Sequence, residues 1–386
     1  MNAIGMDVVF LLSHIPNPRI NKRIHLIKDV MMTSVVCIRR KSSDIWEQHH
    51  MDVPHHIFLM DVPNSSQLLK RVGYSFSFAT KSIKILNNYR PKSIYVSGFD
   101  SLIIACIYAL FRKVKIIYEV ADLREVFLST KRQFISNFKT KLIKAVERIC
   151  FLKIQLLVIT SELFFERYFC RLVKQQNALF IPNIPDFNAF ERYQKKESGI
   201  FTVGFIGGLR YLRQMKMLVD AAEVANVAVF FAGAGGTFEG MKEIQEYCLN
   251  KQYVTFSGKY NYATEIAALY SSVDCVFAVY DADNPNVQIA LPNKLYESIY
   301  CNLPIIVAAN TYLSQLVLQW GVGIPVDHKD KNGLINVLQK LSTDKMCYQK
   351  ISNACETHKH ILDANFYNKQ LLSLLVSIVN KKSLTI

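Results

Sequence analysis

Two groups of charged and glycine residues in the second half of the chain have the spacing that a site for a phosphorylated ligand requires. The first is the segment GFIGGLRYLR, where an apolar run ends at Ile206 and two glycines and two arginines follow, Gly207, Gly208, Arg210 and Arg213. A glycine pair lets the backbone approach a ligand closely, and a following helix offers free N–H groups to an anion. Arginine adds bidentate hydrogen bonds to phosphate oxygens. A tight turn with two surface arginines is the alternative interpretation.

The second group is PNKLYES, in which Lys294 and Glu297 are three residues apart and share one face of a predicted helix. An exposed ion pair of little energetic value is one interpretation of this pair. However, Lys294 lies in the first helical turn, where the helix dipole disfavours a cation unless an anion is bound there. The two groups together predict a diphosphate site.

The elements that must position these residues alternate between short apolar runs and longer helical patterns. Such runs as IIYEV and LLVIT are apolar throughout, which is typical of parallel strands covered on both faces. Five strands are expected in each half, at 7–12, 34–38, 93–97, 115–119 and 156–160, and at 201–206, 228–232, 254–257, 275–278 and 305–308. This rhythm predicts an α/β fold of two Rossmann-like, doubly wound domains facing across a cleft.

A chain of 386 residues, 51% hydrophobic and 20% charged, is too long for one ordinary core. The apolar periodicity breaks between Phe180 and Lys196, where proline, asparagine and charged residues indicate a linker. We therefore expect a first domain at residues 1–185 and a second at 186–364. A C-terminal helix at about 365–386 is expected to join the first domain.

The net charge of +15 is concentrated in residues 1–200, which hold 30 Lys and Arg against 16 Asp and Glu. Residues 201–386 hold 16 against 15. A basic half is typical of proteins that face nucleic acid, an anionic membrane or a phosphorylated ligand, although a solvated surface explains it too. No nucleic-acid-binding motif is recognisable, so nucleic acid is not an expected partner.

Nine cysteines, odd in number and without a Cys-x-x-Cys pair, indicate reduced core thiols. The N-terminal apolar run starts at Asp7 and lacks the features of a signal peptide, so a cytoplasmic location is expected. The apolar stretch Ser101 to Phe111 is about half the roughly 20 residues needed to cross a bilayer and is predicted to be a buried helix. Any membrane contact should be peripheral, on the inner face.

The two groups, in this order and about 85 residues apart, resemble the donor domain of retaining glycosyltransferases of family 4, which have the GT-B fold. The resemblance continues through VFFAGAGG, VTFSGKY, TEIAALYSSVDCVFAVYD and NLPIIVA, and covers residues 200–340. It is weaker in the first half, where YEVADL, VITSE and IPNIPD occur in the family's order.

This resemblance implies a hexosyltransferase that moves a sugar, with retention, from a nucleotide-diphosphate donor to a glycan or polyprenyl-diphosphate-linked acceptor. It also implies a place in the synthesis of capsule, O-antigen or exopolysaccharide. The basic charge of residues 1–200 favours an acceptor at an anionic membrane surface. Arg210, Arg213 and Lys294 would neutralise the diphosphate and Glu297 would bind the ribose. Other donor-binding residues would be Gly207, Gly208, Gly233, Gly235, Gly258, Tyr260, Pro292 and Asn293.

The resemblance also assigns the acceptor to the first domain. The sequence departs from the family pattern at two positions, one on the donor side and one on the acceptor side. The family's first glutamate is replaced by Ile289, and Ala121 stands where a histidine precedes Asp122. The acceptor contact therefore rests on Asp122, on His14 or on neither. No cofactor and no metal are expected, because the pair Asp281 and Asp283 is interpreted as a solvated turn rather than a phosphate site.

Three alternatives come from other classes of protein. A dehydrogenase needs Gly-x-Gly-x-x-Gly, but the nearest segment, which begins at Gly233, has Phe238 at the third glycine position. A GT-B nucleotide-sugar epimerase would share the fold. A non-catalytic basic module would bind a membrane or nucleic acid through the first half. The donor base, sugar and acceptor are not encoded in these residue types.

Overall fold

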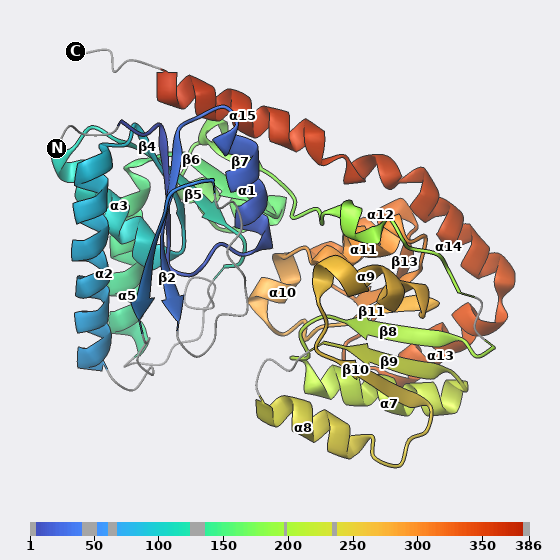
Figure 1. Ribbon diagram of the computed structural model, residues 1–386. Helices are drawn as coiled ribbons and strands as arrows, with labels where there is room; N and C mark the ends of the chain where they lie inside the picture. The colour runs from blue at the N-terminus through green and yellow to red at the C-terminus, as the bar shows by residue number, and fades with distance from the viewer. Residues whose placement is uncertain are drawn as a thin grey trace. The chain divides into compact units, whose positions relative to one another are not determined.

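The computed structural model describes residues 5–40, 52–60, 68–123, 136–196, 199–233 and 238–380. The chain divides into two compact units, each with its own parallel sheet (Figure 1). The first unit is Met1–Pro182 together with Asn365–Ile386, and the second is Asn183–Ala364.

The first unit holds a seven-stranded sheet in the order β3-β2-β1-β4-β5-β6-β7, with every neighbouring pair parallel. Its strands are β1 Val8–Leu12, β2 Thr33–Arg40, β3 His55–Met60, β4 Ser93–Ser97, β5 Lys115–Val120, β6 Ile154–Ile159 and β7 Ala178–Phe180. Its helices are α1 Pro18–Lys28, α2 Leu68–Tyr89, α3 Phe99–Phe111, α5 Ser136–Phe151, α6 Glu162–Arg167 and α15 Ala364–Asn380.

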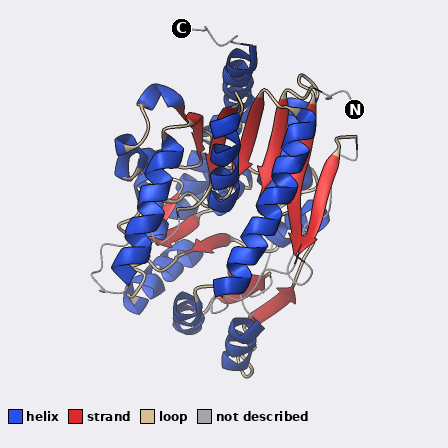
Figure 2. Ribbon diagram, turned by 90° about the vertical axis from the view of Figure 1, so that its left-hand side faces the viewer, coloured by secondary structure: helices blue, strands red, loops and turns tan. Residues whose placement is uncertain are grey.

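Helices cover both faces of this first sheet. On one face, Phe10 of β1 belongs to a core shared with Ile24 of α1 and with Leu371 and Leu375 of α15. On the other face α2, α3 and α5 pack side by side, and Figure 2 shows these helices in front of the red strands. The residues of β1 are buried throughout, as expected for a central strand covered on both faces.

The second unit holds a six-stranded parallel sheet in the order β10-β9-β8-β11-β12-β13. Its strands are β8 Thr202–Ile206, β9 Ala228–Ala232, β10 Val254–Gly258, β11 Cys275–Ala278, β12 Ile305–Ala308 and β13 Gly323–Val326. Its helices are α7 Leu212–Ala225, α8 Phe238–Tyr247, α9 Tyr262–Ser271, α10 Pro285–Ile289, α11 Asn293–Tyr300, α12 Tyr312–Trp320, α13 Lys331–Thr343 and α14 Lys345–Thr357.

The predicted fold class, two doubly wound α/β domains, is confirmed. In each sheet the strand order reverses beside the first strand, between β1 and β4 and between β8 and β11. Ligands of open α/β sheets bind at the carboxyl ends of the strands at this reversal. Glycine and the two predicted arginines follow β8 directly, so the local sequence and the topology point to the same edge.

Two expectations about burial need correction. The helix predicted as buried, α3, is buried on one face only, and Leu110 and Phe111 at its end are 64% and 78% exposed. Seven of the nine free cysteines are buried, whereas Cys347 is half-buried and Cys170 is exposed. Within the described residues, the search for a helix long and apolar enough to cross a bilayer finds none.

Candidate functional site

Three glycines line up along the carboxyl edge of the second sheet, one at the end of each of three neighbouring strands. Gly207, Gly233 and Gly258 have φ of +136°, +136° and +74°, values that side-chain-bearing residues rarely adopt. The Gly207 N–H donates to Ala232 O at 2.8 Å, and the Gly233 N–H donates to Gly258 O at 2.8 Å. A Cβ on Gly233 would lie 2.0 Å from Gly207 O. The edge is therefore a close-packed surface of backbone; Gly235 lies outside the described residues.

Lys294 is a buried cation at this edge. It lies in the first turn of α11 with 8% of its surface exposed, and its Nζ donates to the Tyr280 hydroxyl at 3.0 Å. Nζ lies 4.2 Å from the centroid of the Phe205 ring, and a Cβ on Gly207 would come within 3.0 Å of it. Among the described residues no carboxylate lies within ion-pairing distance of Lys294. A buried charge without a counterion is costly, so this position favours an anionic ligand.

The two arginines lie on either side of the start of α7. Helix α7 begins at Leu212, so that Arg213 is in its first turn and Arg210 precedes it. Both arginines are exposed, and neither has an ion-pair partner within the described part of the chain. A Cβ on Gly208 would lie 3.5 Å from Arg210 Nε, which places Arg210 beside the glycine pair. Arg210 and Lys294 thus approach the same turn, which can hold a diphosphate.

Helix α11 begins beside this turn. Its N-cap is Pro292, which supplies no side-chain hydrogen bond to the first turn. Asn293 Oδ1 accepts a hydrogen bond from Asn183 Nδ2 at 2.8 Å, which ties the helix start to the segment at the beginning of the second unit. The start of a helix that lacks a side-chain cap suits an anion.

Glu297 lies on the inner face of α11 and is 3% exposed. Its carboxylate accepts hydrogen bonds from the hydroxyls of Tyr262, at 2.7 Å, and Tyr270, at 2.5 Å. Burial raises the pKa of the Tyr270 hydroxyl well above its ordinary value, and the charge of Glu297 raises it further. Burial, followed by the same charge, also raises the pKa of half-buried Tyr260. The two bound hydroxyls therefore fix the orientation of the Glu297 carboxylate.

Sequence reasoning did not single out the aromatic partners of these charged residues. Phe205 and Tyr280 surround Lys294, while Tyr262 and Tyr270 hold Glu297. Tyr211, next to Arg210, packs on Tyr280 with ring centroids 4.8 Å apart. Phe205 lies inside the first motif, whereas Tyr262 and Tyr270 come from α9 and Tyr280 from the segment after β11, so their partners are known only from the fold.

In the first unit, His14 and Asp122 follow β1 and β5, at the carboxyl edge of that sheet. His14 is half-buried, and its Nδ1 lies 2.7 Å from Ile15 O, whereas Asp122 is exposed. Gly98, at the end of the intervening strand β4, has φ of +97°, and a Cβ there would lie 2.4 Å from Ser13 Oγ. This close approach of the ends of β1 and β4 was not predicted.

Residues 186–358 match the family described as glycosyl transferases group 1. The match spans most of the second unit, so this unit is similar to group 1 glycosyltransferase domains. The predicted enzyme class, a retaining glycosyltransferase of the hexosyltransferase type, is confirmed. Such enzymes use nucleotide-sugar donors and are typically independent of metal ions. No curated protein matches the chain.

Solved structures of low sequence identity match nearly the whole chain. HepE from Anabaena, in complex with UDP, is 17% identical with a TM-score of 0.71, covering 96% of this chain and 100% of its own. Sucrose-phosphate synthase from Thermosynechococcus elongatus is 15% identical, with a TM-score of 0.73 and coverage of 97% and 100%. UDP-GlcNAc 2-epimerase from Neisseria meningitidis, bound to UDP-GlcNAc, is 12% identical, with a TM-score of 0.60 and coverage of 96% and 100%. These similarities establish the GT-B fold.

Proposed function

We propose that the protein transfers a sugar, with retention, from a nucleoside-diphosphate donor to a glycan or polyprenyl-diphosphate-linked acceptor in the synthesis of a bacterial surface polysaccharide. The observation that carries the donor half of this proposal is the buried Lys294 ammonium, which has no carboxylate partner among the described residues and lies against Gly207. A diphosphate at the glycine turn would supply the missing negative charge.

Arg210, Arg213 and Lys294 would stabilise the leaving diphosphate. When the bond between the sugar and the phosphate stretches, negative charge grows on the departing phosphate oxygens, and cations held in place lower the energy of that state. One such contact is typically worth about 3 kcal/mol. No protein nucleophile is needed in this scheme, because the departing phosphate oxygen can take the proton of the acceptor hydroxyl.

The remaining donor contacts belong to backbone and to Glu297. We assign the phosphate oxygens to backbone around Gly207, Gly208 and the start of α11 at Pro292 and Asn293, and the ribose hydroxyls to Glu297. The nucleotide base would lie along the ends of β9 and β10, near Gly233, Gly258 and Tyr260. The carboxylate orientation held by Tyr262 and Tyr270 supports the ribose role, because a fixed acceptor loses little freedom when it binds.

UDP is the nucleotide to test first, since the similar HepE was solved with UDP and with UDP-glucose. Isothermal titration of UDP should give one site per chain. We expect Lys294→Met to abolish this binding and Lys242→Met to leave it unchanged, because Lys242 is an exposed lysine of α8 in the same unit. Equal binding by both variants would reject the donor site, and the screen would move to GDP and other nucleotides if the parent protein did not bind UDP.

The acceptor is assigned to the first unit, where His14 and Asp122 lie at the carboxyl edge of the sheet. Either side chain can accept a hydrogen bond from a sugar hydroxyl. The basic charge of residues 1–200 favours an acceptor that carries phosphate. His14→Ala and Asp122→Asn should each raise the KM for the acceptor without changing the affinity for the donor nucleotide, and unchanged acceptor kinetics in both would remove these residues from the proposal.

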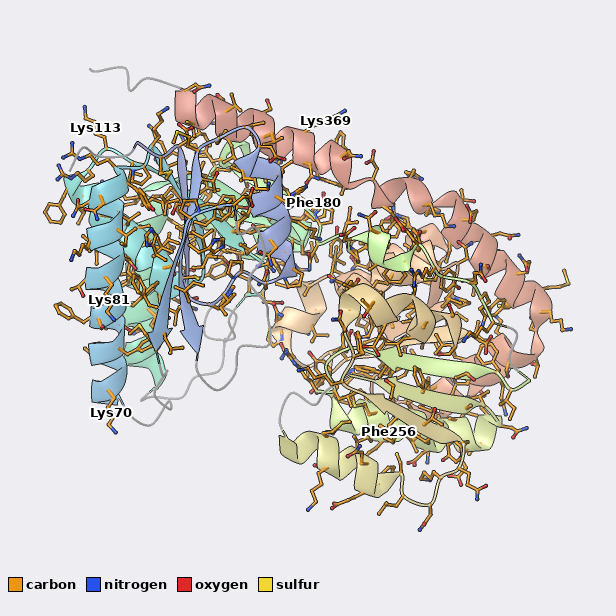
Figure 3. All side chains as sticks on the ribbon, in the orientation of Figure 1. Lys70, Lys81, Lys113, Phe180, Phe256 and Lys369 are labelled. Carbon is orange, nitrogen blue, oxygen red and sulfur yellow. The ribbon has the colours of Figure 1, made fainter. Side chains whose placement is uncertain are left out.

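The outer surface of α2, α3 and α5 supports attachment to an anionic membrane. Exposed apolar side chains on these helices and just beyond α5 are Val72, Phe76, Ile107, Leu110, Phe111, Leu142, Ile149 and Leu152. The helices contain eight Lys and Arg, four in α2 and four in α5, against two acidic residues, Asp100 and Glu147. Figure 3 shows Lys70 and Lys81 projecting from α2 and Lys113 beyond the end of α3. Apolar residues among basic ones are typical of peripheral membrane surfaces.

Sedimentation with anionic vesicles tests the membrane proposal. We expect the protein to pellet with phosphatidylglycerol vesicles at low salt. Phe111→Asp should reduce pelleting, while Phe366→Asp, at an exposed phenylalanine of α15, should not. A parent protein that stays in the supernatant at low salt would contradict membrane attachment and leave the donor site unaffected.

A nucleotide-sugar epimerase is the second candidate, favoured by the similarity in fold to the Neisseria enzyme. An epimerase of this type would release a free epimerised sugar, whereas a transferase needs an acceptor for efficient turnover. Incubation of each UDP-sugar without acceptor, followed by sugar analysis, separates the two.

A further inference from the structure

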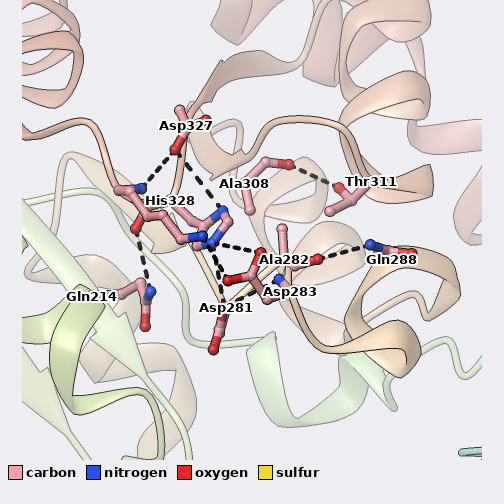
Figure 4. Close-up of polar contacts among 10 residues, drawn as sticks. Gln214, Asp281, Ala282, Asp283, Gln288, Ala308, Thr311, Asp327 and His328 are labelled. Carbon is pink, nitrogen blue, oxygen red and sulfur yellow. Dashed lines mark hydrogen bonds and ion pairs between the residues drawn. The ribbon is translucent and has the colours of Figure 1, made fainter. Parts of the chain in front are cut away.

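A second cluster of ionisable side chains lies along the carboxyl edge of the second sheet. Asp281 and Asp283 are in the loop after β11, and His328 is in the turn after β13, two strands further along the sheet. Figure 4 shows the three side chains pointing toward one another. The donor reaction proposed above uses none of them.

The distances among these side chains fit a metal site. His328 Nε2 lies 3.3 Å from Asp281 Oδ1 and 3.7 Å from Asp283 Oδ1. One ligand atom from each residue lies within 4.8 Å of the other two. Ligand atoms at roughly 2.1 Å from a shared ion stand roughly 3.0 to 3.5 Å apart in tetrahedral or octahedral geometry. The two distances from His328 Nε2 are therefore within a few tenths of an ångström of those that a shared ion requires.

His328 gives an independent indication of a ligand. The residue is only 7% exposed, and its Nε2 has no partner with hydrogen-bond geometry among the described residues, although carboxylate oxygens of Asp281 and Asp283 lie 3.3 and 3.7 Å away. Buried ring nitrogens ordinarily have a hydrogen-bond partner. The nitrogen is directed at the two carboxylates, whose side chains are 46% and 65% exposed, so the cluster is closed by the histidine on one side and open to water on the other.

The neighbouring charges leave this arrangement available to a cation. Lys329 Nζ lies 2.6 Å from Asp283 Oδ2, whereas the other oxygen of Asp283 faces His328. Asp327 adds a third carboxylate, with Oδ1 4.0 Å from His328 Nδ1. Three carboxylates against one lysine leave the cluster negative when His328 is neutral, which attracts a cation.

We propose that Asp281, Asp283 and His328 bind a divalent transition-metal ion, of which Mn²⁺ and Zn²⁺ are the probes, with water in the remaining positions. One imidazole nitrogen and two carboxylates suit such ions, whereas Ca²⁺ and Mg²⁺ prefer oxygen ligands alone. The ion would join the loop after β11 to the turn after β13. It would also brace α7, because the carbonyl of His328 accepts a hydrogen bond from Gln214 Nε2 at 3.2 Å, next to Arg213 (Figure 4).

Metal titration of the whole chain, after removal of bound ions with EDTA, tests this site. Loss of the free Mn²⁺ signal in electron paramagnetic resonance, and calorimetry with Zn²⁺, should each show one ion per chain. Asp283→Asn and His328→Gln should each weaken binding by about 10-fold or more. The control is Glu243→Gln, which removes an exposed carboxylate that is likewise paired to a lysine, Lys216 Nζ at 2.7 Å, in the same unit.

Lys329→Met gives a second test, which can be carried out even if the His328→Gln variant does not fold. Removing the competing ammonium from Asp283 should tighten Mn²⁺ binding several-fold if the carboxylates are ligands. Absence of saturable binding below about 1 mM, or binding unaffected by Asp283→Asn and Lys329→Met, would overturn the proposal and leave His328 as a proton-dependent ion-pair partner. UDP binding measured in EDTA reports on the donor site alone, so failure of one proposal can be distinguished from failure of the other.

Discussion

The two units bury positive charge in different ways. In the first unit, Arg19 and Arg23 of α1 approach one buried carboxylate, with Nε to Glu119 distances of 2.9 and 3.6 Å. The Tyr95 hydroxyl donates to the same carboxylate at 2.5 Å. In the second unit, Lys294 is buried to a similar degree but meets a tyrosine hydroxyl and the face of Phe205.

This difference separates a structural charge from a charge kept for a ligand. The carboxylate of Glu119 compensates the arginines within the protein, so that removing it would leave buried cations unpaired. Lys294 has no carboxylate within ion-pairing distance among the described residues, so its compensation must come from outside the described side chains of the unit. Mutation of Glu119 should therefore lower the stability of the first unit, whereas mutation of Lys294 should weaken ligand binding by the second.

Lys294→Met should have the largest effect. Loss of a cation at the leaving phosphate is expected to lower kcat/KM by about 1,000-fold, or about 4 kcal/mol. Because an unpaired buried charge is replaced by an apolar chain of similar length, urea denaturation should show unchanged or slightly higher stability. A clear loss of stability with normal turnover would place Lys294 among the structural charges.

Glu119→Gln should have the opposite signature. Without the carboxylate, two arginines lose their shared counterion, and we expect unfolding free energy to fall by about 3 kcal/mol. Nucleotide titration below the unfolding temperature should give the parent affinity. A variant as stable as the parent, or one with weakened nucleotide binding, would contradict the contrast between the units.

Arg213→Ala and Glu297→Gln sharpen the comparison inside the second unit. Arg213 is proposed to meet charge that grows during the reaction, so its loss should lower kcat by about 100-fold with a smaller change in donor affinity. Glu297 is proposed to bind ribose, whose charge does not change, so Glu297→Gln should mainly raise the Kd for the nucleotide. Steady-state kinetics and nucleotide titrations of both variants decide whether these roles are reversed or absent.

The smallest expected effect is the dependence of stability on pH. Burial pushes the pKa of Glu119 upward, but the charges of Arg23 and Arg19 outweigh it and hold that pKa below its ordinary value of 4.5. The stabilisation that the ionised Glu119 carboxylate contributes is therefore complete above about pH 4.5. It is lost as the pH falls through the lower pKa that Glu119 has in the folded state. Denaturant titrations between pH 3 and 6 should show a steeper acid loss in the parent than in Glu119→Gln. Equal slopes would mean that Glu119 does not titrate differently in the folded state.

Nine of the ten predicted strands are central or next to an edge, and could be predicted because burial on both faces leaves apolar runs in the sequence; the tenth, β10, is an edge strand. The three strands that were missed are β3, β7 and β13, which lie at sheet edges. The residues of β3 are only partly buried, β7 has three residues, and β13 contains Gly323 and Pro325. Edge strands pack on one side only, so their composition carries a weaker signal.

The residues of the proposed donor site could be predicted where they lie close together in the sequence. Gly207, Arg210 and Lys294 belong to short motifs. The contacts of Lys294 with Phe205 of β8 and with Tyr280, in the segment after β11, are identified only when the fold brings these residues together. The same limit explains why Asp281 and Asp283 were interpreted as a solvated turn. His328 is 45 residues beyond Asp283, and nothing in the intervening sequence links them.

The packing of α15 has a consequence for how the chain is made. Leu371 and Leu375 fill the core beside β1 and α1, so the first unit is interrupted in sequence by the whole of the second. During synthesis the ribosome therefore releases residues 183–364 before the helix that covers one face of the earlier sheet. Domains generally fold as units as they emerge, so the inserted unit can finish folding while its predecessor still exposes apolar side chains. That interval is when the nascent chain should be most prone to aggregate and to need a chaperone.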